Sequence, residues 1–275
     1  MSRVIVIIVP DGAAVPRNQF LENLFTGPYF DTRNLIEPAS PFVESNSSIS
    51  KAEQIDRARI LAGLKQAAEI DQALPVILVR NTSISNVSTS TLKTVVQNIL
   101  TGPSFDVCYL AKWLDKCSLY QDAIPFDPET GVTVAWTQRP RGLQAVMFNP
   151  EGRDILLGKR SLRNGLAFTL DDQTFDNNLT SQIETGNLVA LTTVPNLIEF
   201  DIVSNATRNS DYQKVDECVV PGDNIETTSN PNNYLVLVLI IVLIIIFGWA
   251  LYKLGPSKVK QKSKYIKPDV SGRLK

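Results

Sequence analysis

Residues 50–82 read SKAEQIDRARILAGLKQAAEIDQALPVILVRNT, and this stretch decides the fold. Ser50 and Glu53 have the spacing of a capping box, which predicts that a helix begins here. One side of that helix is predicted to carry the apolar residues Ala52, Ile55, Ala58, Leu61, Leu64 and Ala68. The apolar run at residues 75–79 then predicts a short buried strand.

The alternation of strands and helices continues on both sides of this stretch. Residues 4–9 (VIVIIV) form a β-branched run typical of a buried parallel strand. Further strands are predicted at residues 106–110, 132–136, 143–148, 188–193 and 197–200, and a loop at 121–131. Helices are predicted over Leu92, Val95, Val96, Ile99 and Leu100, over residues 149–157, where Asn149 and Pro150 suit the first positions, and near 176–184. This order predicts an α/β fold with a mostly parallel sheet flanked by helices.

The composition of the 275 residues excludes several kinds of chemistry. The chain has no histidine, so neither a Ser-His-Asp unit nor an imidazole metal site can form. Cys108, Cys117 and Cys218 lack metal-ligand spacing, and we expect them to be reduced thiols. The first apolar run is too short for a secretory signal, so no cleavable signal is expected. We also expect no cofactor and no resident metal.

The C-terminal part has the composition of a membrane anchor. Residues 234–252 read YLVLVLIIVLIIIFGWALY, which is a run of 19 residues without a charge. As a helix it would be about 28 Å long, enough to cross a bilayer core. Tyr234, Trp249 and Tyr252 flank it as an interfacial aromatic belt does. The predicted organisation is therefore a head (1–217), a linker (218–233), a transmembrane helix (234–254) and a basic tail (255–275).

The tail has the opposite charge to the head. Residues 253–275 hold eight basic residues and one acidic residue, net +7, which leaves 19 basic and 27 acidic residues upstream, net −8. The tail is expected to bind anionic lipid or nucleic acid through Lys258, Lys260, Lys262, Lys264 and Lys267. The positive-inside rule places the tail in the cytosol, whereas late insertion of a folded head places it on the far side. We favour the second, with the head facing the cytosol or a capsid.

Several stretches resemble the lipooligosaccharide-type glycosyltransferases of family 25, which have a GT-A, Rossmann-like fold. The resemblance covers residues 3–212 and is one of order and spacing. Its parts are VIVIIV at 4–9, the segment 50–85, FDVCYLAKW at 105–113, GLQAVMFNPEGRDILL at 142–157, and the closing section at 175–212. The family implies a nucleotide-sugar site at the end of the strand that follows the long helix.

At that position this chain departs from the family. The family strand ends in a carboxylate cluster such as Asp-x-Asp, because a divalent cation on a sugar diphosphate needs hard oxygen ligands. Here the strand ends in Arg80-Asn81-Thr82, and Arg80 would repel a metal ion. In an active, metal-independent enzyme Arg80 would instead bind the diphosphate directly. The alternative is an arginine with a purely structural role.

Two acidic positions downstream are also candidates. Asp176 opens a predicted helix, where N-capping accounts for it without catalysis. The pair Asp171-Asp172 has the ligands for Mg²⁺, although a solvated turn is the simpler interpretation. Sequons at five asparagines would suit a lumenal head, namely Asn46, Asn81, Asn86, Asn178 and Asn205.

Degenerate transferase-like heads on one membrane span resemble virion components of large DNA viruses that have an internal membrane. The sequence thus favours a structural protein of a virion membrane, a minor capsid or membrane-linking component whose head contacts capsid or other virion proteins. An active membrane-bound glycosyltransferase is the alternative, with Arg80, Asn81, Thr82 and Asp176 as the residues of its site. A tail-anchored adaptor on a host endomembrane is a third possibility.

Overall fold

A computed structural model describes residues 3–11, 19–38, 47–85, 87–115, 117–171 and 173–200. All of them belong to the first of two compact units, Met1–Asp223. Within the described ranges, no helix is long and apolar enough for a membrane crossing. The predicted linker, the predicted span at 234–254 with Tyr234, Trp249 and Tyr252, and the basic tail lie outside the described residues.

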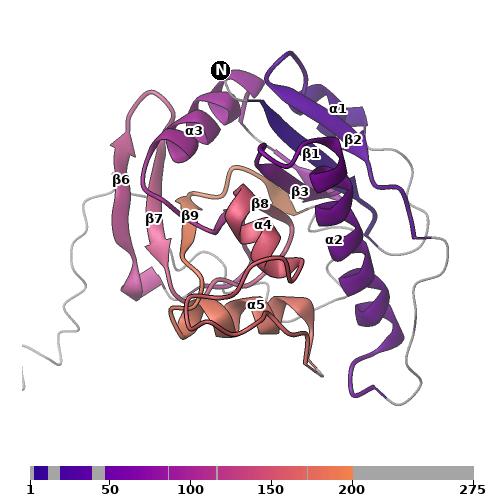
Figure 1. Ribbon diagram of the computed structural model, residues 1–275. Helices are drawn as coiled ribbons and strands as arrows, with labels where there is room; N and C mark the ends of the chain where they lie inside the picture. Colours follow the sequence, from indigo (N-terminus) through magenta and orange to yellow (C-terminus); the bar gives the residue numbers. More distant parts are fainter. Residues whose placement is uncertain are drawn as a thin grey trace, which may run out of the picture. The chain divides into compact units, whose positions relative to one another are not determined.

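An eight-stranded sheet runs through the centre of the described unit, in the order β2-β1-β3-β8-β5-β9-β7-β6 (Figure 1). Its strands are β1 (Val4–Val9), β2 (Phe30–Asn34), β3 (Val76–Arg80), β5 (Val107–Ala111), β6 (Gln121–Asp127), β7 (Val132–Thr137), β8 (Ala145–Phe148) and β9 (Ala190–Val194). A separate pair joins β4 (Ser83–Ile84) to β10 (Glu199–Phe200) in antiparallel fashion. The predicted α/β class is therefore confirmed.

The sheet is mixed, so the expectation of a mostly parallel sheet is only partly right. β1 pairs in parallel with β2 and β3, and β5 pairs in parallel with β9. However, β8 lies antiparallel between β3 and β5, and β7 lies antiparallel between β9 and β6. The residues of β7 and β8 are nearly all buried, like those of the neighbouring strands. A strand that is buried on both faces has a similar composition whether it runs parallel or antiparallel to its neighbours, so its direction could not be predicted.

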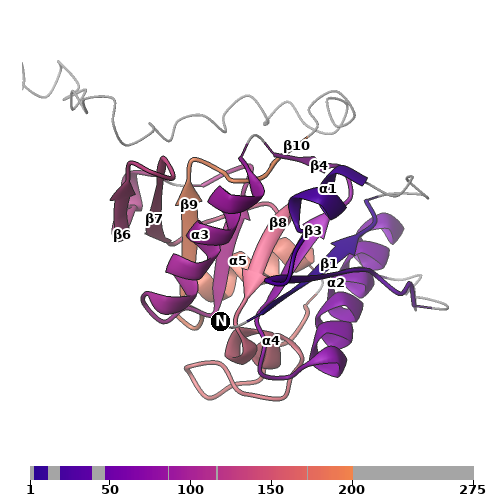
Figure 2. The same cartoon turned by 90° about the horizontal axis from the view of Figure 1, so that it is seen from above.

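Helices cover both faces of the sheet. They are α1 (Gln19–Leu24), α2 (Lys51–Ile70), α3 (Thr89–Thr101), α4 (Pro150–Leu156) and α5 (Phe175–Glu184), with a 3₁₀ turn at Cys117–Leu119. Helices α1 and α3 lie over one face, and α2, α4 and α5 lie over the other (Figure 2). The buried side chains of the two sets belong to two separate apolar clusters. The result is a three-layer, Rossmann-like arrangement with one apolar core on each side of the sheet.

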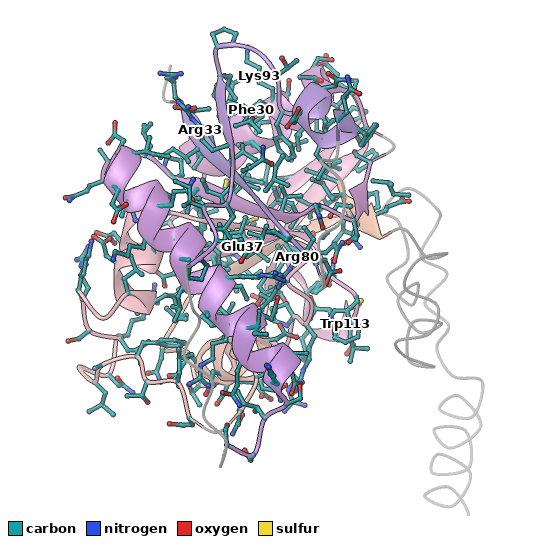
Figure 3. All side chains as sticks on the ribbon, turned by 90° about the vertical axis from the view of Figure 1, so that its right-hand side faces the viewer. Phe30, Arg33, Glu37, Arg80, Lys93 and Trp113 are labelled. Atoms are coloured by element: carbon teal, nitrogen blue, oxygen red, sulfur yellow. The ribbon has the colours of Figure 1, made fainter. Side chains whose placement is uncertain are left out.

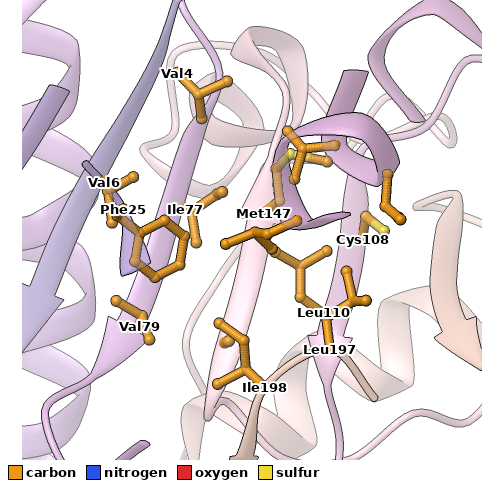
Figure 4. Packing of buried hydrophobic residues seen from close by; sticks show 14 of the residues in the cluster. Val4, Val6, Phe25, Ile77, Val79, Cys108, Leu110, Met147, Leu197 and Ile198 are labelled. Carbon is orange, nitrogen blue, oxygen red and sulfur yellow. The ribbon is translucent and has the colours of Figure 1, made fainter. Parts of the chain in front are cut away.

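The core under α1 and α3 shows how alternate strand residues divide between the two faces. Val4, Val6 and Ile77 point toward this core, while Ile5, Ile7 and Leu78 point toward the opposite one. Figure 4 shows Val4, Val6 and Ile77 in the first core together with Phe25, Val79, Cys108, Leu110, Met147, Leu197 and Ile198. Every residue of β1 is buried, as its β-branched run predicts.

The capping box predicted for α2 is present, because the Ser50 hydroxyl accepts from the Glu53 amide and the Glu53 carboxylate accepts from the Ser50 amide. The predicted apolar face is partly wrong. Leu64 and Ala68 are buried and Leu61 packs partly buried against the same core, but the most buried positions also include Ile60, Gly63 and Ala67, which were not predicted. The fully buried residues of α2 begin at Ile60, so the predicted apolar residues nearer its start, Ala52, Ile55 and Ala58, are exposed or half-buried.

Sequence patterns missed the edges of the sheet. Residues 121–127, predicted as part of a loop, form the edge strand β6, whose side chains are exposed or half-buried. β2, the other edge, was not predicted either, and only Phe30 of its five residues is buried. An edge strand carries little apolar alternation because water reaches it, so its sequence resembles that of a loop.

The short helix α4 is tied tightly to the start of β5. Asn149 caps α4 by accepting from the Gly152 amide, and its own amide group donates to the Phe105 carbonyl. A Cβ at Gly152 would lie 2.1 Å from the Asp106 carbonyl oxygen, so only glycine fits. Arg153 is fully buried and donates to the carbonyls of Asp71, Gln72 and Leu74 after α2. Together these contacts join α2, α4 and β5.

Gly152→Ala is expected to destabilise the protein by about 3 kcal/mol, because backbone atoms of two elements have to separate. Gly158→Ala is the control. Gly158 has a φ of +70° and open space at its Cβ, so this change costs only the backbone strain, about 1 kcal/mol. Chemical denaturation of the two variants measures both values. Equal losses would show that the contact with Asp106 is looser than described.

Candidate functional site

The carboxyl ends of β1 and β3 define the place where a sheet of this kind binds ligands. The chain passes from β1 to β2 on one side and then returns to β3 on the other, so a topological switch lies between β1 and β3. Asp11 follows β1, and Arg80, Asn81 and Thr82 lie at the end of β3. The structure thus places the predicted strand-end residues at the edge of the sheet where such sheets bind ligands.

Arg80, which is labelled in Figure 3, is held by an acidic residue of α2. Its guanidinium forms a two-pronged ion pair with Asp56, in which the Nη2–Oδ2 distance is 2.7 Å and Nη1 bonds to Oδ1. Its Nε donates to the Leu143 carbonyl. The Arg80 side chain is 8% exposed, against 38% for Asp56. All three guanidinium nitrogens therefore donate to groups of the protein itself.

Asn81 and Thr82 are also engaged within the chain. The Asn81 side-chain oxygen accepts from the Asp11 amide at 2.9 Å, and the Thr82 hydroxyl donates to the Asp11 carboxylate at 3.1 Å. Gln144 donates to the hydroxyls of Thr82 and Ser83. Among the described residues, the end of β3 is thus a hydrogen-bond network in which Asp56 pairs with Arg80 and Asp11 contacts Asn81 and Thr82.

Residues 140–144, called here the 140–144 loop, fill the space beside this strand end. The loop leads into β8, which is inserted between β3 and β5. On one side Leu143 and Gln144 accept from Arg80 through their carbonyls. On the other side the Pro140 carbonyl accepts from Thr180 of α5 at 2.7 Å, and the Arg141 side chain donates to Asn177. The loop therefore bridges the end of β3 and the start of α5.

Asp176 lies at the α5 end of this bridge, but not as a cap. Thr174 caps α5, and Asp176 is in the first turn, where both its carboxylate oxygens accept from the Gly142 amide at 3.1 Å. The expectation that Asp176 is the N-cap is therefore wrong. Asp176 is half-buried, and desolvation raises its pKa from 3.8 to about 6, although the Gly142 amide, Arg141, Trp113 and Arg80 lower it. Asp176 and Arg80 are thus close enough to interact electrostatically.

The hollow at the end of β3 is small and apolar. It has room for about one water molecule and is lined by Val9, Ile60, Leu78, Val79, Arg80, Leu143, Val146 and Phe148. A sugar nucleotide needs a cleft of several hundred Å³ with converging polar groups. This hollow has neither the size nor the chemistry for it.

The remaining acidic candidates are not gathered into a site. Asp171 lies in an exposed turn, where its carbonyl accepts from Arg57 and from the Gln173 amide, and Asp172 is outside the described residues. Within the described ranges, no three Asp, Glu, Cys or His side chains are grouped as metal ligands are. The acidic turn therefore matches the simpler interpretation given above.

The structure changes the expectations for two of the glycosylation sequons and for one cysteine. Asn81 and Asn178 are 7% and 4% exposed, so neither is accessible to a glycosyl transfer enzyme in the folded head. The other three sequon asparagines lie outside the described residues. Cys117 is disulfide-bonded, so the expectation of reduced thiols is wrong for this residue, while Cys108 is free and buried.

A second polar cluster lies just after the end of β5, and the sequence analysis did not predict it. Lys112 is buried, and its ammonium donates to the Thr193 carbonyl at 3.0 Å and lies 5.5 Å from the Tyr120 ring. Burial lowers the pKa of Lys112 to about 8. Asp115 accepts from the hydroxyls of Tyr120 and Thr137 at 2.7 Å. The lysine appears in the sequence inside FDVCYLAKW, but nothing there indicates that it is buried.

Comparisons with known proteins give limited information. No protein-family model matches the sequence, and no curated protein matches it. Similar solved structures include A197 from STIV, with 10% identity and a TM-score of 0.35 over 69% of this chain and 81% of that one. They also include UDP-glucose pyrophosphorylase in its apo form (12% identity, TM-score 0.30) and complexed with UDP-glucose (11%, 0.26), each over 69% of this chain and 72% of that one. The fold assignment rests on strand order and layers instead.

Asp56→Asn is expected to destabilise the protein by about 2–3 kcal/mol, because it leaves the Arg80 guanidinium buried without a counter-charge. The double variant Asp56→Asn with Arg80→Met should recover part of this loss. Glu37→Gln is a matched control, because Glu37 pairs with Arg59 in a more exposed place and its loss should cost under about 1 kcal/mol. Denaturant unfolding measures all three. A cost at Asp56 no larger than that at Glu37 would contradict the role given to this pair.

Proposed function

We propose that this head is a non-catalytic packing module of a membrane-anchored structural virion protein, either a minor capsid component or one that links a capsid to an inner membrane. The head would contact capsid or other virion proteins. The segment at 234–254 would cross the membrane, and the basic tail would bind anionic lipid or nucleic acid. The proposal includes the origin of the head, which would derive from a family 25-like glycosyltransferase with a GT-A fold.

The observation that supports the loss of catalysis is the Arg80–Asp56 ion pair. A divalent cation at the end of β3 would need carboxylate ligands there, but the chain supplies a guanidinium whose charge repels the metal. In a metal-independent enzyme that guanidinium would have to leave Asp56 and the Leu143 carbonyl before it could bind a diphosphate. Three hydrogen bonds would be broken for each ligand bound, which weakens binding.

The filled surroundings of Arg80 support the same proposal. The 140–144 loop lies beside the strand end, and the hollow there is lined mostly by apolar side chains. Binding of a donor sugar would require this loop to move away from both Arg80 and α5. A packing module has no such requirement, because it uses its outer surface while the crevice stays closed.

The membrane and tail parts of the proposal come from the sequence. A run of 19 uncharged residues followed by a tail of net +7 has the order of a single-span anchor with a phosphate-binding end. The acidic head and the basic tail would then face different partners on opposite sides of the membrane. The same order would also suit a protein of a host endomembrane, which is the alternative location.

Nucleotide sugars are expected to leave the thermal midpoint of the full-length protein in detergent unchanged. UDP-glucose, UDP-galactose and GDP-mannose at millimolar concentration, each with and without Mn²⁺, should give no shift, because the crevice is occupied by the chain. A ligand at 100 times its Kd stabilises a protein by about 2.7 kcal/mol, or several degrees. A nucleotide-sugar enzyme measured in parallel confirms the sensitivity. A donor-dependent shift of that size would favour the active glycosyltransferase instead.

Two arginines in the proposed span are expected to abolish membrane integration. Val242→Arg with Ile245→Arg places two charges near the middle of the segment, at a cost of about 3 kcal/mol each. The unchanged protein should stay with membranes after alkaline carbonate extraction, and the variant should be released. The control is Ser257→Arg with Ser263→Arg, which adds the same charges to the tail and should remain in the membrane. Release of the unchanged protein would contradict the anchor.

A further inference from the structure

Cys117 carries one half of a disulfide bond at the surface of the described unit. It lies in the 3₁₀ turn Cys117–Leu119, where it is half-buried beside the exposed Ser118. It belongs to neither of the two apolar cores. A cysteine in such a place can be reached by an oxidant, which a cysteine enclosed in a core cannot.

The composition of the chain leaves one partner for Cys117. The sequence holds three cysteines, at positions 108, 117 and 218. Cys108 is a free thiol that is 0% exposed in the core under α1 and α3. Burial raises the pKa of Cys108, so it stays protonated and unreactive. Within a single chain the partner of Cys117 is therefore Cys218, which lies outside the described residues.

The length of chain after the last described strand permits this pairing. β10 ends at Phe200, and 17 residues (201–217) separate it from Cys218. An extended chain of that length spans up to about 55 Å, whereas a unit of the size of Met1–Asp223 is about 45 Å across. Cys218 can thus reach the turn at Cys117 wherever on the head β10 ends.

The turn at Cys117 is a firm point of attachment. The Tyr120 amide donates to the Cys117 carbonyl at 3.0 Å. The hydroxyls of Tyr120 and of Thr137 in β7 both donate to the Asp115 carboxylate at 2.7 Å. Residues on both sides of Cys117 are therefore fixed to each other and to the sheet, so a bond at Cys117 ties its partner to the body of the head.

We propose that Cys117 and Cys218 form an intrachain disulfide that fastens the start of the linker to the head, and that the head therefore matures under oxidising conditions. Each thiol gives up one hydrogen. The two electrons and two protons pass to the disulfide of a protein oxidoreductase, which becomes a dithiol. Such bonds persist where thiols are not continually reduced, which excludes an ordinary reducing cytosol as the place where the head works.

The bond would shorten the tether between head and membrane. Without it, 33 residues (201–233) separate Phe200 from the predicted span, which is up to about 115 Å of extended chain. With it, 15 residues (219–233) remain, or about 50 Å. This consequence deepens the proposed function and rests on its membrane anchor, whereas the pairing itself does not. Carbonate extraction tests the anchor and peptide mapping tests the pairing, so the two can fail separately.

Peptide mapping of the full-length protein from insect cells tests the pairing. The cells are lysed with N-ethylmaleimide present, which blocks every accessible thiol that is reduced in the cell. The protein is then unfolded and digested after Lys, Arg and Glu without reduction, which releases Cys117 in residues 117–129 and Cys218 in residues 218–226. These two peptides should be joined to each other, and a reducing agent should separate them.

Cys117→Ser and Cys218→Ser should each remove the joined peptides and lower the thermal midpoint by several degrees, because each opens a loop of about 100 residues. The double variant should fall no further than either single one, since all three lose the same bond. Cys108→Ala is the control and should keep the joined peptides. Additive losses, maleimide on Cys117, or Cys117 joined to a second copy of the chain would overturn the proposal.

Discussion

The ion pair between Arg80 and Asp56 is the interaction on which the rest of the site depends. A guanidinium that is 8% exposed at the end of a central strand requires a carboxylate, and α2 supplies it through Asp56. The pair connects the start of α2 to β3, and it sets the charge at the switch between β1 and β3. Sheets of this type bind phosphates or metal ions at such a place, but here the protein neutralises the position with its own residues.

The reversed strand β8 explains why this crevice is filled. Because β8 runs antiparallel to β3 and β5, the loop that precedes it lies at the carboxyl ends of those two strands. The 140–144 loop therefore occupies the place where ligands enter in sheets of this type. Its polar groups satisfy Arg80 and Thr82 on one side and meet α5 on the other. One topological feature thus accounts for the closed strand end and for the contact between Gly142 and Asp176.

The sequence predicted the interior of the fold better than its edges. β1, α3 and α4 follow directly from a β-branched run, an apolar repeat and the Asn149-Pro150 start, because local pattern and burial agree there. β2 and β6 were missed because water reaches edge strands and removes their apolar pattern. The directions of β7 and β8 could not be predicted, because a fully buried strand looks the same in either direction.

For the site, the sequence located Arg80, Asn81 and Thr82 but not their partners. Asp56 lies 24 residues before Arg80, and Gln144 lies 62 residues after Thr82, and no local spacing connects such positions. Asp176 was expected to cap α5, but Thr174 has that role. The partner of Asp176 is the Gly142 amide, which lies 34 residues away in the chain and so could not be inferred from a local pattern. The burial of Lys112 could not be predicted either, because a lysine that follows an apolar strand is usually exposed to solvent.

The chain itself occupies the end of β3, and a crystal of the protein soaked with UDP-glucose and Mn²⁺ would show whether a nucleotide can displace it. Arg80 should remain paired with Asp56, the 140–144 loop should stay in place, and no nucleotide density should be found near Asp11 and Thr82. Nucleotide density there, with the Arg80 guanidinium turned from Asp56 to the diphosphate, would contradict this expectation and identify a working nucleotide-sugar site.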